Sequence, residues 1–291
     1  MNILKPNGYI DVICYYSKIA PKLKKFLKNK EIATKIYLPY GLPTLLKRGS
    51  KEEPLYIQEF IHGTNKKFLD MREKYRKLAD ARNKLTKEQI KIWEYFVPRK
   101  LIEFLYATNK EGPGKDLDRI YFDIDRKDIS AINSQEVAKK LLEIIKQDKD
   151  FKIKYKEFVL WTGNSFHVYL FFNKKVNHDF YEKNIHFNKD KPLESFTGRW
   201  VEKIKKQIKV NVIAGHEKIS KTINIDPSQS PSGKMGRVPF SLYVKDPKNI
   251  SGIAIPLNYK DLSDKNLINK LKSYTPEKVI AELNKLSKKI P

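Results

Sequence analysis

The sequence predicts an α+β fold, with mixed or antiparallel sheets flanked by helices. Apolar residues make up 40% of the 291-residue chain and aromatic residues 12%, which is enough for a packed core. Short strand-like runs are interspersed with stretches whose apolar residues recur at helical spacing. The two kinds of segment do not follow the strict strand–helix–strand alternation of a parallel sheet, and this favours the α+β class.

The N-terminal part is expected to contain one helix and two strands. An apolar stretch at 8–27 leads into a short amphipathic helix that Pro21 interrupts. Residues 35–43 (KIYLPYGLP) indicate a strand followed by a turn, and residues 55–61 (LYIQEFI) indicate a second strand.

Two helical stretches then precede a turn and a strand. Residues 66–83 are dominated by charge and predict an exposed helix. Residues 86–106 carry apolar side chains at helical spacing, with Pro98 breaking or kinking the pattern. The glycines of 109–115 (NKEGPGK) indicate a turn, and the strand 119–125 (RIYFDID) follows it.

The rest of the chain continues to mix helices and strands. A helix is expected with Ser134 as its N-cap and with one apolar face, formed by Val137, Leu141, Ile144 and Ile145. The remaining predicted elements are two strands within 158–172 that turn at 162–165, an amphipathic helix at 193–210, strands at 222–225 and 240–245, and helical pieces to Ile290.

The charge balance favours a polyanionic partner. Lys and Arg number 59 against 34 Asp and Glu, which gives a net charge of +25. Such an excess favours nucleic acid, because each phosphate contact releases condensed counterions; a lysine-rich or thermophile composition is the alternative explanation. No signal peptide and no apolar run long enough to span a membrane is evident, so we expect a protein of the cytoplasm, associated with the nucleoid. The single cysteine, Cys14, excludes an internal disulfide and a cysteine-rich zinc site.

Asp123 and Asp125 are the strongest local signal of chemistry. They stand at positions i and i+2 of a predicted strand, so both side chains project from the same face. Two adjacent carboxylates repel one another unless a cation neutralises them, and carboxylate oxygens are the ligands that Mg²⁺ and Mn²⁺ prefer. A strand end with two exposed acids is the simpler alternative.

A glycine-containing turn supplies a second candidate site. The segment Thr162-Gly163-Asn-Ser165-Phe-His167 lies between two apolar strands, and places His167 at the start of the second one. Backbone N–H groups of such a turn can cradle a phosphate, and a neighbouring histidine can donate a hydrogen bond to an oxyanion. A structural histidine would give the same pattern.

A third carboxylate ends another alternating strand. Residues 223–226 (INID) place Asp226 where it could complete a metal site, and Arg237 and Lys245 follow as candidate ligands of a triphosphate. Nucleotidyl transfer needs two metal ions at the reacting phosphate and cations on the departing pyrophosphate. These three weak signals, in this order, supply that set.

This order of motifs resembles the archaeo-eukaryotic primase superfamily, and most of the chain is similar to one branch of it, the polymerase domain of bacterial ligase D and its stand-alone archaeal relatives. The similar segments are YYSKIAPKLKKFL, KIYLPYG, LYIQEF, IEFLYATNKEGPGKDLDRIYFDID, INIDPSQSPSGK and VPFSLYVKDPKNISGIAIPLNYKDL, which together span residues 8 to 263. The resemblance implies a primase-like catalytic core and a template-directed polymerase that fills gaps and extends ends in non-homologous end joining.

The resemblance also implies roles for individual residues. Asp123, Asp125 and Asp226 match the family's metal carboxylates, His167 its triphosphate-contacting histidine, and Ser241 the serine of its nucleotide pocket. A two-metal site of Mn²⁺ or Mg²⁺, without zinc, is expected. The complete predicted nucleotide site is Thr162, Gly163, Ser165, His167, Arg237, Ser241 and Lys245.

The resemblance also implies the partners: DNA with gaps or broken ends, its 5′ phosphate, and ribo- or deoxynucleoside triphosphates, with a DNA ligase and a Ku-type protein as further partners. No membrane partner is expected. Candidate DNA contacts are Lys22, Lys24, Lys25, Lys35 and Tyr56, with Phe60 as a second stacking candidate unless it packs in the core. We expect one domain over 1–291, with a DNA-contacting part at 1–110, a catalytic core at 111–263 and a helical tail at 264–291.

Two other functions remain open from the sequence. One is a primase that starts chains de novo, because the segment RVPFSL at 237–242 and the length of the turn at 162–165 resemble the replicative primase small subunit. That subunit commonly carries a Cys/His zinc site, which one cysteine cannot build. The other alternative is an inactive DNA-binding accessory subunit, against which the three retained carboxylates argue.

Overall fold

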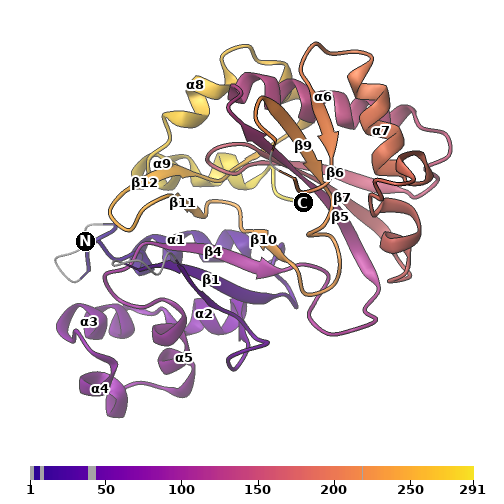
Figure 1. Ribbon diagram of the computed structural model, residues 1–291. Helices are drawn as coiled ribbons and strands as arrows, with labels where there is room; N and C mark the ends of the chain where they lie inside the picture. Colours follow the sequence, from indigo (N-terminus) through magenta and orange to yellow (C-terminus); the bar gives the residue numbers. More distant parts are fainter. Residues whose placement is uncertain (1–2, 7–9, 39–43, 218) are drawn as a thin grey trace. The chain divides into compact units, whose positions relative to one another are not determined.

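The computed structural model describes residues 3–6, 10–38, 44–217 and 219–291. The chain forms two compact units, each built from segments that are distant in sequence. Unit 1 comprises Met1–Ala107, Met235–Ala254 and Tyr274–Lys288, and unit 2 comprises Thr108–Lys234, Ile255–Ser273 and Lys289–Pro291. Helices and antiparallel or mixed sheets occur in both units, which confirms the predicted α+β class (Figure 1).

The main sheet of unit 1 has five antiparallel strands. Its order is β10-β4-β1-β2, and a short fifth strand, β3, also pairs with β1. These strands are β1 (Glu31–Tyr37), β2 (Thr44–Lys47), β3 (Leu55–Tyr56), β4 (Ile102–Ala107) and β10 (Met235–Arg237). A separate hairpin joins β11 (Leu242–Val244) to β12 (Ile250–Ile253).

Aromatic side chains form the core of unit 1. Tyr16, Phe60, Phe96 and Phe104 are fully buried, and their ring centroids lie 4.8 to 5.9 Å apart in the contacts they make. They join the sheet to the helices that cover it, which is the ordinary way an α+β layer pair buries its apolar faces. The helices of this unit are α1 (Ile13–Leu23), α2 (Ile57–Gly63), α3 (Lys66–Lys74), α4 (Leu78–Ala81) with the 3₁₀ turn η1 (Arg82–Lys84), α5 (Lys87–Tyr95) and α9 (Pro276–Ser287).

Three predicted elements of unit 1 are wrong in type or extent. The predicted strand 55–61 is a strand only at Leu55–Tyr56, because Glu59 accepts the backbone N–H of Tyr56 and caps the helix α2 there. The charged stretch 66–83 is two short helices, since the extended residue Tyr75 ends α3. The helix expected over 86–106 ends at Tyr95, and the apolar residues after Pro98 form the strand β4.

Other predictions for this unit agree with the structure. The helix α1 is present, although it runs through Pro21 to Leu23 and is not interrupted there. A strand is present at Glu31–Tyr37, where the segment 35–43 predicted one. The turn predicted at the end of that segment falls on residues 39–43, which lie outside the described residues. The strand predicted at 240–245 is β11, and helices do close the chain.

Unit 2 is built on a six-stranded sheet. Its order is β13-β6-β7-β5-β9-β8, and all pairs are antiparallel except β8 with β9. The strands are β5 (Leu117–Lys127), β6 (Tyr155–Trp161), β7 (Phe166–Val176), β8 (Val212–Ala214), β9 (Thr222–Asp226) and β13 (Ile255–Leu257). The predicted strands at 119–125, 158–172 and 222–225 are therefore confirmed.

Helices cover one face of this sheet. Trp200 of α7 packs edge-on against Phe122 of β5, at 5.8 Å between ring centroids, and α6 lies beside α7 (Figure 1). Since Phe122 and Ile124 project toward these helices, Asp123 and Asp125 must project from the opposite face. The helical elements are α6 (Ala131–Gln147), the π-helical turn η2 (Tyr181–Ile185), the 3₁₀ turns η3 (Pro192–Glu194) and η4 (Tyr259–Ser263), α7 (Phe196–Lys205) and α8 (Leu267–Lys272).

Ser134 is not the N-cap of α6. The helix starts one turn earlier, with Ser130 at the cap position, and Ser134 is a fully buried residue inside it. The predicted apolar face of Val137, Leu141, Ile144 and Ile145 is buried as expected. The helix predicted at 193–210 is the shorter α7. In the described part of the chain, no helix is both long and apolar enough to cross a bilayer.

Candidate active site

Three neighbouring strands of unit 2 place Asp226, Asp123 and His167 in one row. Asp123 of β5 is the direct pairing partner of Asp226 on β9 and of His167 on β7. Residues directly opposite one another in antiparallel strands project from the same face of a sheet, with Cβ atoms about 4.5–5.5 Å apart. The register therefore brings together two of the three predicted carboxylates and the predicted histidine, although they are separated by up to about a hundred residues in the chain.

His167 contacts Asp123 on one side of its ring and the buried residues Tyr169 and Tyr121 on the other. Its Nε2 is 3.4 Å from Oδ1 of Asp123, and its Nδ1 is 3.1 Å from the hydroxyl of Tyr169. The ring also packs against Tyr121, at 5.2 Å between centroids, and only 9% of the residue is exposed. These contacts fix the ring orientation, so that Nε2 faces the acidic row.

The carboxylate of Asp226 is held by the loop that follows it. The backbone N–H of Ser228 donates to Oδ1 at 2.8 Å, and the Ser228 hydroxyl donates to Oδ2 at 2.9 Å. Tyr181 lies close enough for its ionisation to depend on Asp226. Burial raises the pKa of Tyr181 well above its ordinary value, and the charges of Glu182 and Asp226 add to the effect. The Tyr181 phenol is therefore a protonated neighbour of this carboxylate.

Asp125 lies two residues along the same face and pairs with Asn224. Within the described residues, no group of three or more His, Cys, Asp and Glu side chains is arranged to hold a metal ion. The donors at the row are nonetheless of the kind that hard divalent cations select, and two carboxylates face each other directly across the strands. The residues present thus fit a divalent cation in donor type and register, with Asp123 and Asp226 as the facing pair and Asp125 one step away on the sheet.

The predicted phosphate-binding turn is present between β6 and β7, but its two hydroxyls already form hydrogen bonds within the protein. The Thr162 N–H donates to the Ser165 carbonyl at 2.8 Å, the Thr162 hydroxyl accepts from the Ser165 N–H at 3.2 Å, and the Ser165 hydroxyl donates to the Ile124 carbonyl. Gly163 adopts φ +98°, which favours glycine. Among the described residues, the N–H groups of Gly163 and Asn164 have no hydrogen-bond partner, so these donors, rather than the two hydroxyls, can meet a phosphate.

Arg126 holds this turn and was not identified from the sequence. Its Nε donates to the Asn164 carbonyl at 3.0 Å, its Nη2 to the Asn164 side-chain oxygen at 2.8 Å, and its Nη1 to the Ile129 carbonyl at 2.6 Å. One guanidinium thus ties the strand of Asp123 and Asp125 to the turn that precedes His167. The signal in the sequence was a cation directly after the acidic pair, and it gave no indication of the partner.

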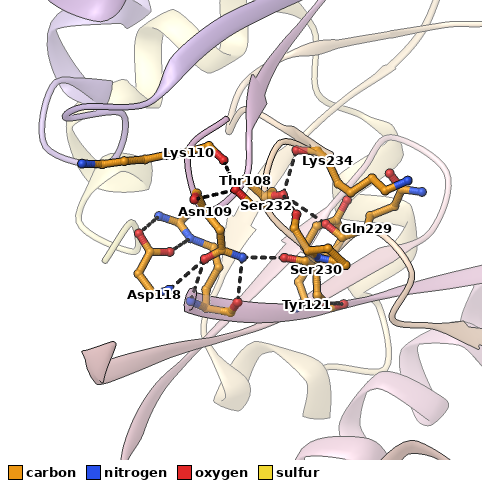
Figure 2. A network of polar contacts seen from close by, with 11 residues as sticks. Thr108, Asn109, Lys110, Asp118, Tyr121, Gln229, Ser230, Ser232 and Lys234 are labelled. Carbon is orange, nitrogen blue, oxygen red and sulfur yellow. Dashed lines mark hydrogen bonds and ion pairs between the residues drawn. The ribbon is translucent and has the colours of Figure 1, made fainter. Parts of the chain in front are cut away.

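A network of buried polar groups fixes the loop after Asp226 to β5 (Figure 2). The hydroxyl of Ser230 accepts the N–H of Tyr121 at 3.0 Å and donates to its carbonyl at 2.9 Å. Asn109 donates to the carbonyls of Arg119 and Ser230, and accepts the N–H groups of Asp118 and Arg119 (Figure 2). The Thr108 hydroxyl lies within hydrogen-bonding distance of three carbonyls of the same loop. The segment that starts from Asp226 is therefore attached to the strand that carries Asp123.

The other predicted nucleotide ligands belong to unit 1. Arg237 donates from Nη2 to Glu103 at 3.0 Å and from Nη1 to the Leu242 carbonyl at 3.0 Å. Burial lowers the pKa of Arg237, but the charge and hydrogen bond of Glu103 outweigh this and raise it. The hydroxyl of Ser241 is buried and accepts the N–H of Phe104 at 2.7 Å, whereas Lys245 is exposed. Their role as nucleotide ligands stays a prediction.

The predicted DNA contacts of unit 1 differ in exposure. Lys22, Lys24 and Lys25 are exposed at the end of α1 and just beyond it. Lys35 is half-buried on β1, with its Nζ 5.1 Å from the centroid of the Tyr37 ring.

The two residues proposed to stack on a base, Tyr56 and Phe60, differ in solvent exposure. Tyr56 is 36% exposed, and a base could reach it there. Phe60 is fully buried among other rings and packs in the core, so Tyr56 is the one that stays available.

Comparison with known proteins gives a likeness in structure but none in sequence. No protein-family model matches the chain, and no curated protein matches it in sequence. The structure is similar to that of the polymerase domain of ligase D from Mycobacterium tuberculosis, solved in complex with DNA. The two have a TM-score of 0.56 and 14% identity, over 96% of this chain and 92% of that one. At this identity the likeness establishes the fold, and it confirms at that level the resemblance seen in the sequence.

Proposed function

We propose that this chain is a metal-dependent, template-directed nucleotidyltransferase that fills gaps and extends ends in non-homologous end joining. The observation that carries the proposal is the row of Asp226, Asp123 and His167 on one face of the unit 2 sheet, in a fold shared with a polymerase domain. The net charge of +25 supports DNA as the substrate class.

Asp123, Asp226 and Asp125 are the residues that would hold Mg²⁺ or Mn²⁺. When bound, such ions activate the attacking hydroxyl and stabilise charge on the reacting phosphate. The facing carboxylates of Asp123 and Asp226 repel one another, so a cation is favoured there. The two hydrogen bonds from Ser228 keep the Asp226 carboxylate oriented without consuming all its lone pairs.

The groups around the row would bind the phosphates of the incoming nucleotide. Nε2 of His167, fixed by Tyr169 and Tyr121, can donate a hydrogen bond to a phosphate oxygen beside Asp123. The N–H groups of Gly163 and Asn164 can add two more donors, held in place by Arg126. In this proposal, the cations of Arg237 and Lys245 contact the departing pyrophosphate.

Replacing a carboxylate of the row is expected to abolish catalysis and to leave DNA binding in place. For Asp226→Asn and for Asp123→Asn we expect primer extension on a gapped, 5′-phosphorylated duplex to fall about a thousand-fold, because the site loses charge that supports metal binding. Asp125→Ala is expected to act in the same direction. Asp116→Asn, which removes an exposed acid from the loop before β5, is the control and is expected to keep the wild-type rate. Extension at the wild-type rate by Asp226→Asn would falsify the assignment.

The same assay separates end joining from priming. An unprimed single-stranded template offered with nucleoside triphosphates tests the primase alternative, which the four-residue turn at 162–165 favours. Products on the gapped duplex alone support end joining, products on both templates support a primase, and the absence of metal-dependent incorporation on either template supports the accessory subunit.

A further inference from the structure

A lysine-lined cavity in unit 1 has no role in the function proposed so far. It has a volume of about 520 Å³, within the range of ligand pockets. It lies over α3 and the segment that follows, and its lining residues are Lys66, Lys67, Asp70, Met71, Lys74, Tyr75 and Lys84. The stretch 66–83 was predicted from sequence only as an exposed charged helix.

The shape of this surface follows from how α3 is anchored. Phe68 and Arg72 are buried on its inner side: Phe68 packs edge-on against Trp93 at 6.0 Å, and Arg72 forms a fully buried ion pair with Asp11, with Nε 3.0 Å from Oδ2. Residues 67, 70, 71 and 74 share the helical spacing of one stripe and point into the cavity. Lys66, Lys67 and Lys74 are therefore presented by a fixed helix, whereas Lys84 comes from the turn η1.

The charges around the cavity are unbalanced. Four lysines line it against one acid, Asp70. Among the residues that the structure describes, none of these four lysines forms an ion pair with a carboxylate, whereas many other lysines of the chain do. Like charges around one cavity repel one another, and an anion with several charges relieves that repulsion.

The lining of the cavity includes one aromatic ring. Tyr75 is half-buried there together with Met71, the Lys84 ammonium donates a hydrogen bond to its hydroxyl, and the ammonium groups of Lys84 and Lys74 lie 4.7 and 5.6 Å from the centroid of its ring. An aromatic ring among phosphate-binding cations is the combination by which proteins bind single strands, with bases stacked on rings and the backbone held by lysines. A duplex keeps its bases stacked inside and offers none to such a cavity.

We propose that this cavity binds a single-stranded nucleic acid segment, with one base against Tyr75 and neighbouring phosphates on Lys66, Lys67, Lys74 and Lys84. The proposal rests on the proposed function in that it takes nucleic acid as the substrate of the chain. It adds a second contact surface, which belongs to unit 1, whereas the carboxylates belong to unit 2.

The test compares two variants with the same net charge. In one, Lys66, Lys67, Lys74 and Lys84 are changed to Gln. In the control, four exposed lysines of the C-terminal region are changed to Gln; these are Lys265, Lys272, Lys285 and Lys288. Binding of a fluorescent single-stranded oligonucleotide to the full chain is measured over a range of salt concentrations, without metal or nucleotide, so the result does not depend on whether the wild-type protein incorporates nucleotides.

We expect the first variant to bind at least about tenfold more weakly at moderate salt, and its salt-dependence slope to fall by up to about 2.8, at about 0.7 for each lost phosphate contact. The control is expected to stay within about threefold of the wild type. Tyr75→Ala should weaken binding by about tenfold and Tyr75→Phe should not, because stacking needs the ring and not the hydroxyl. Equal losses in the two lysine variants, an unchanged affinity for Tyr75→Ala, or full displacement of the oligonucleotide by millimolar inorganic phosphate would each overturn the proposal.

Discussion

Arg126 illustrates how one side chain can set the geometry of a site without touching the reacting groups. Its three hydrogen bonds reach Asn164 twice and Ile129 once, so a planar guanidinium spans the gap between β5 and the turn before His167. Because strand pairing between β5 and β7 ends at Ile124, nothing in the strand ladder itself fixes the turn beyond that point. We regard Arg126 as a positioning residue.

Changing Arg126 to Ala is therefore expected to raise the KM for nucleotide by about tenfold, because the turn loses the hydrogen bonds that hold it in position. A tenfold change corresponds to about 1.4 kcal/mol, which is the size of one to two such hydrogen bonds. The affinity for DNA and the kcat at saturating nucleotide are expected to change little. Arg126→Lys should behave like Ala, since one ammonium cannot satisfy both oxygens of Asn164. Steady-state primer extension at varied nucleotide concentration measures the effect. A reduced stability with an unchanged KM would show that Arg126 has a structural role only.

The burial of Cys14 predicts a thiol of low reactivity. The residue is 1% exposed, and burial raises the pKa of its thiol to about 11, with the charge of Asp11 adding to the effect and that of Arg72 opposing it. The thiolate is the reactive form, so the native protein should react very slowly with a disulfide reagent at pH about 8 and completely once unfolded. Cys14→Ser is the blank for this titration. Fast stoichiometric reaction of the native protein would contradict the packing described for α1.

At the scale of elements, the connection between β4 and β5 is expected to stabilise unit 2. Asn109 is buried, adopts φ +52° and makes four side-chain hydrogen bonds to the backbone. We expect Asn109→Ala to lower the free energy of unfolding by about 2–4 kcal/mol. The substitution leaves buried backbone polar groups without their hydrogen-bond partner and forces alanine into the left-handed region. Asn109→Gly removes the same hydrogen bonds but tolerates the backbone, so the difference between the two variants isolates the strain. Urea unfolding measures both, and a loss below about 0.5 kcal/mol for Ala would contradict this role.

Elements whose own sequence pattern is typical of one type were predictable. Elements whose type depends on capping or on packing against other parts of the fold were not. The strand at 119–125 and the pair within 158–172 carry β-branched or aromatic residues and are bounded by turn residues, and the structure has them. The segment 55–61 looks equally apolar, yet Ile57 and Phe60 are buried as one side of a short helix that Glu59 caps. After Pro98, the residues of β4 are buried on both faces, a pattern that does not distinguish a strand from a helix.

The same distinction applies to the candidate site. Residue type and order identified Asp123, Asp226 and His167, and the structure places them side by side. Their alignment depends on the pairing register of three strands, to which residues far apart in sequence contribute. The sequence could not show that the Thr162 hydroxyl closes the turn or that Ser228 holds Asp226, because these short-range hydrogen bonds form only in the loop conformation that the chain adopts. The bond from the Ser165 hydroxyl to the Ile124 carbonyl joins residues 41 positions apart, so it depends on tertiary contact.

For the whole molecule, the distribution of charge and of buried phenols determines how stability responds to pH. At neutral pH the chain carries +25, and self-repulsion of this size destabilises the compact state, so loss of lysine charge at alkaline pH relieves part of it. Phenols of unit 2 act in the opposite direction. Burial raises the pKa of Tyr155 to about 12, with the charge of Glu157 adding to the effect. Burial likewise raises the pKa of Tyr259 to about 12, together with its hydrogen bond to Glu143.

A phenol whose pKa is raised in the native state stabilises the fold fully below its unfolded pKa and less as the pH rises through the native one. In the unfolded chain Tyr155 ionises near its ordinary value of 10.0, so above that pH the unfolded state binds fewer protons than the native state and stability falls. Because Tyr155 is only half-buried, we expect wild-type protein to lose about 1 kcal/mol more than Tyr155→Phe between pH about 9 and about 11.5. Urea unfolding of both proteins at several pH values measures this difference, in which the lysine contribution cancels. Parallel curves for the two proteins would mean that this phenol is as well solvated in the native state as in the unfolded chain.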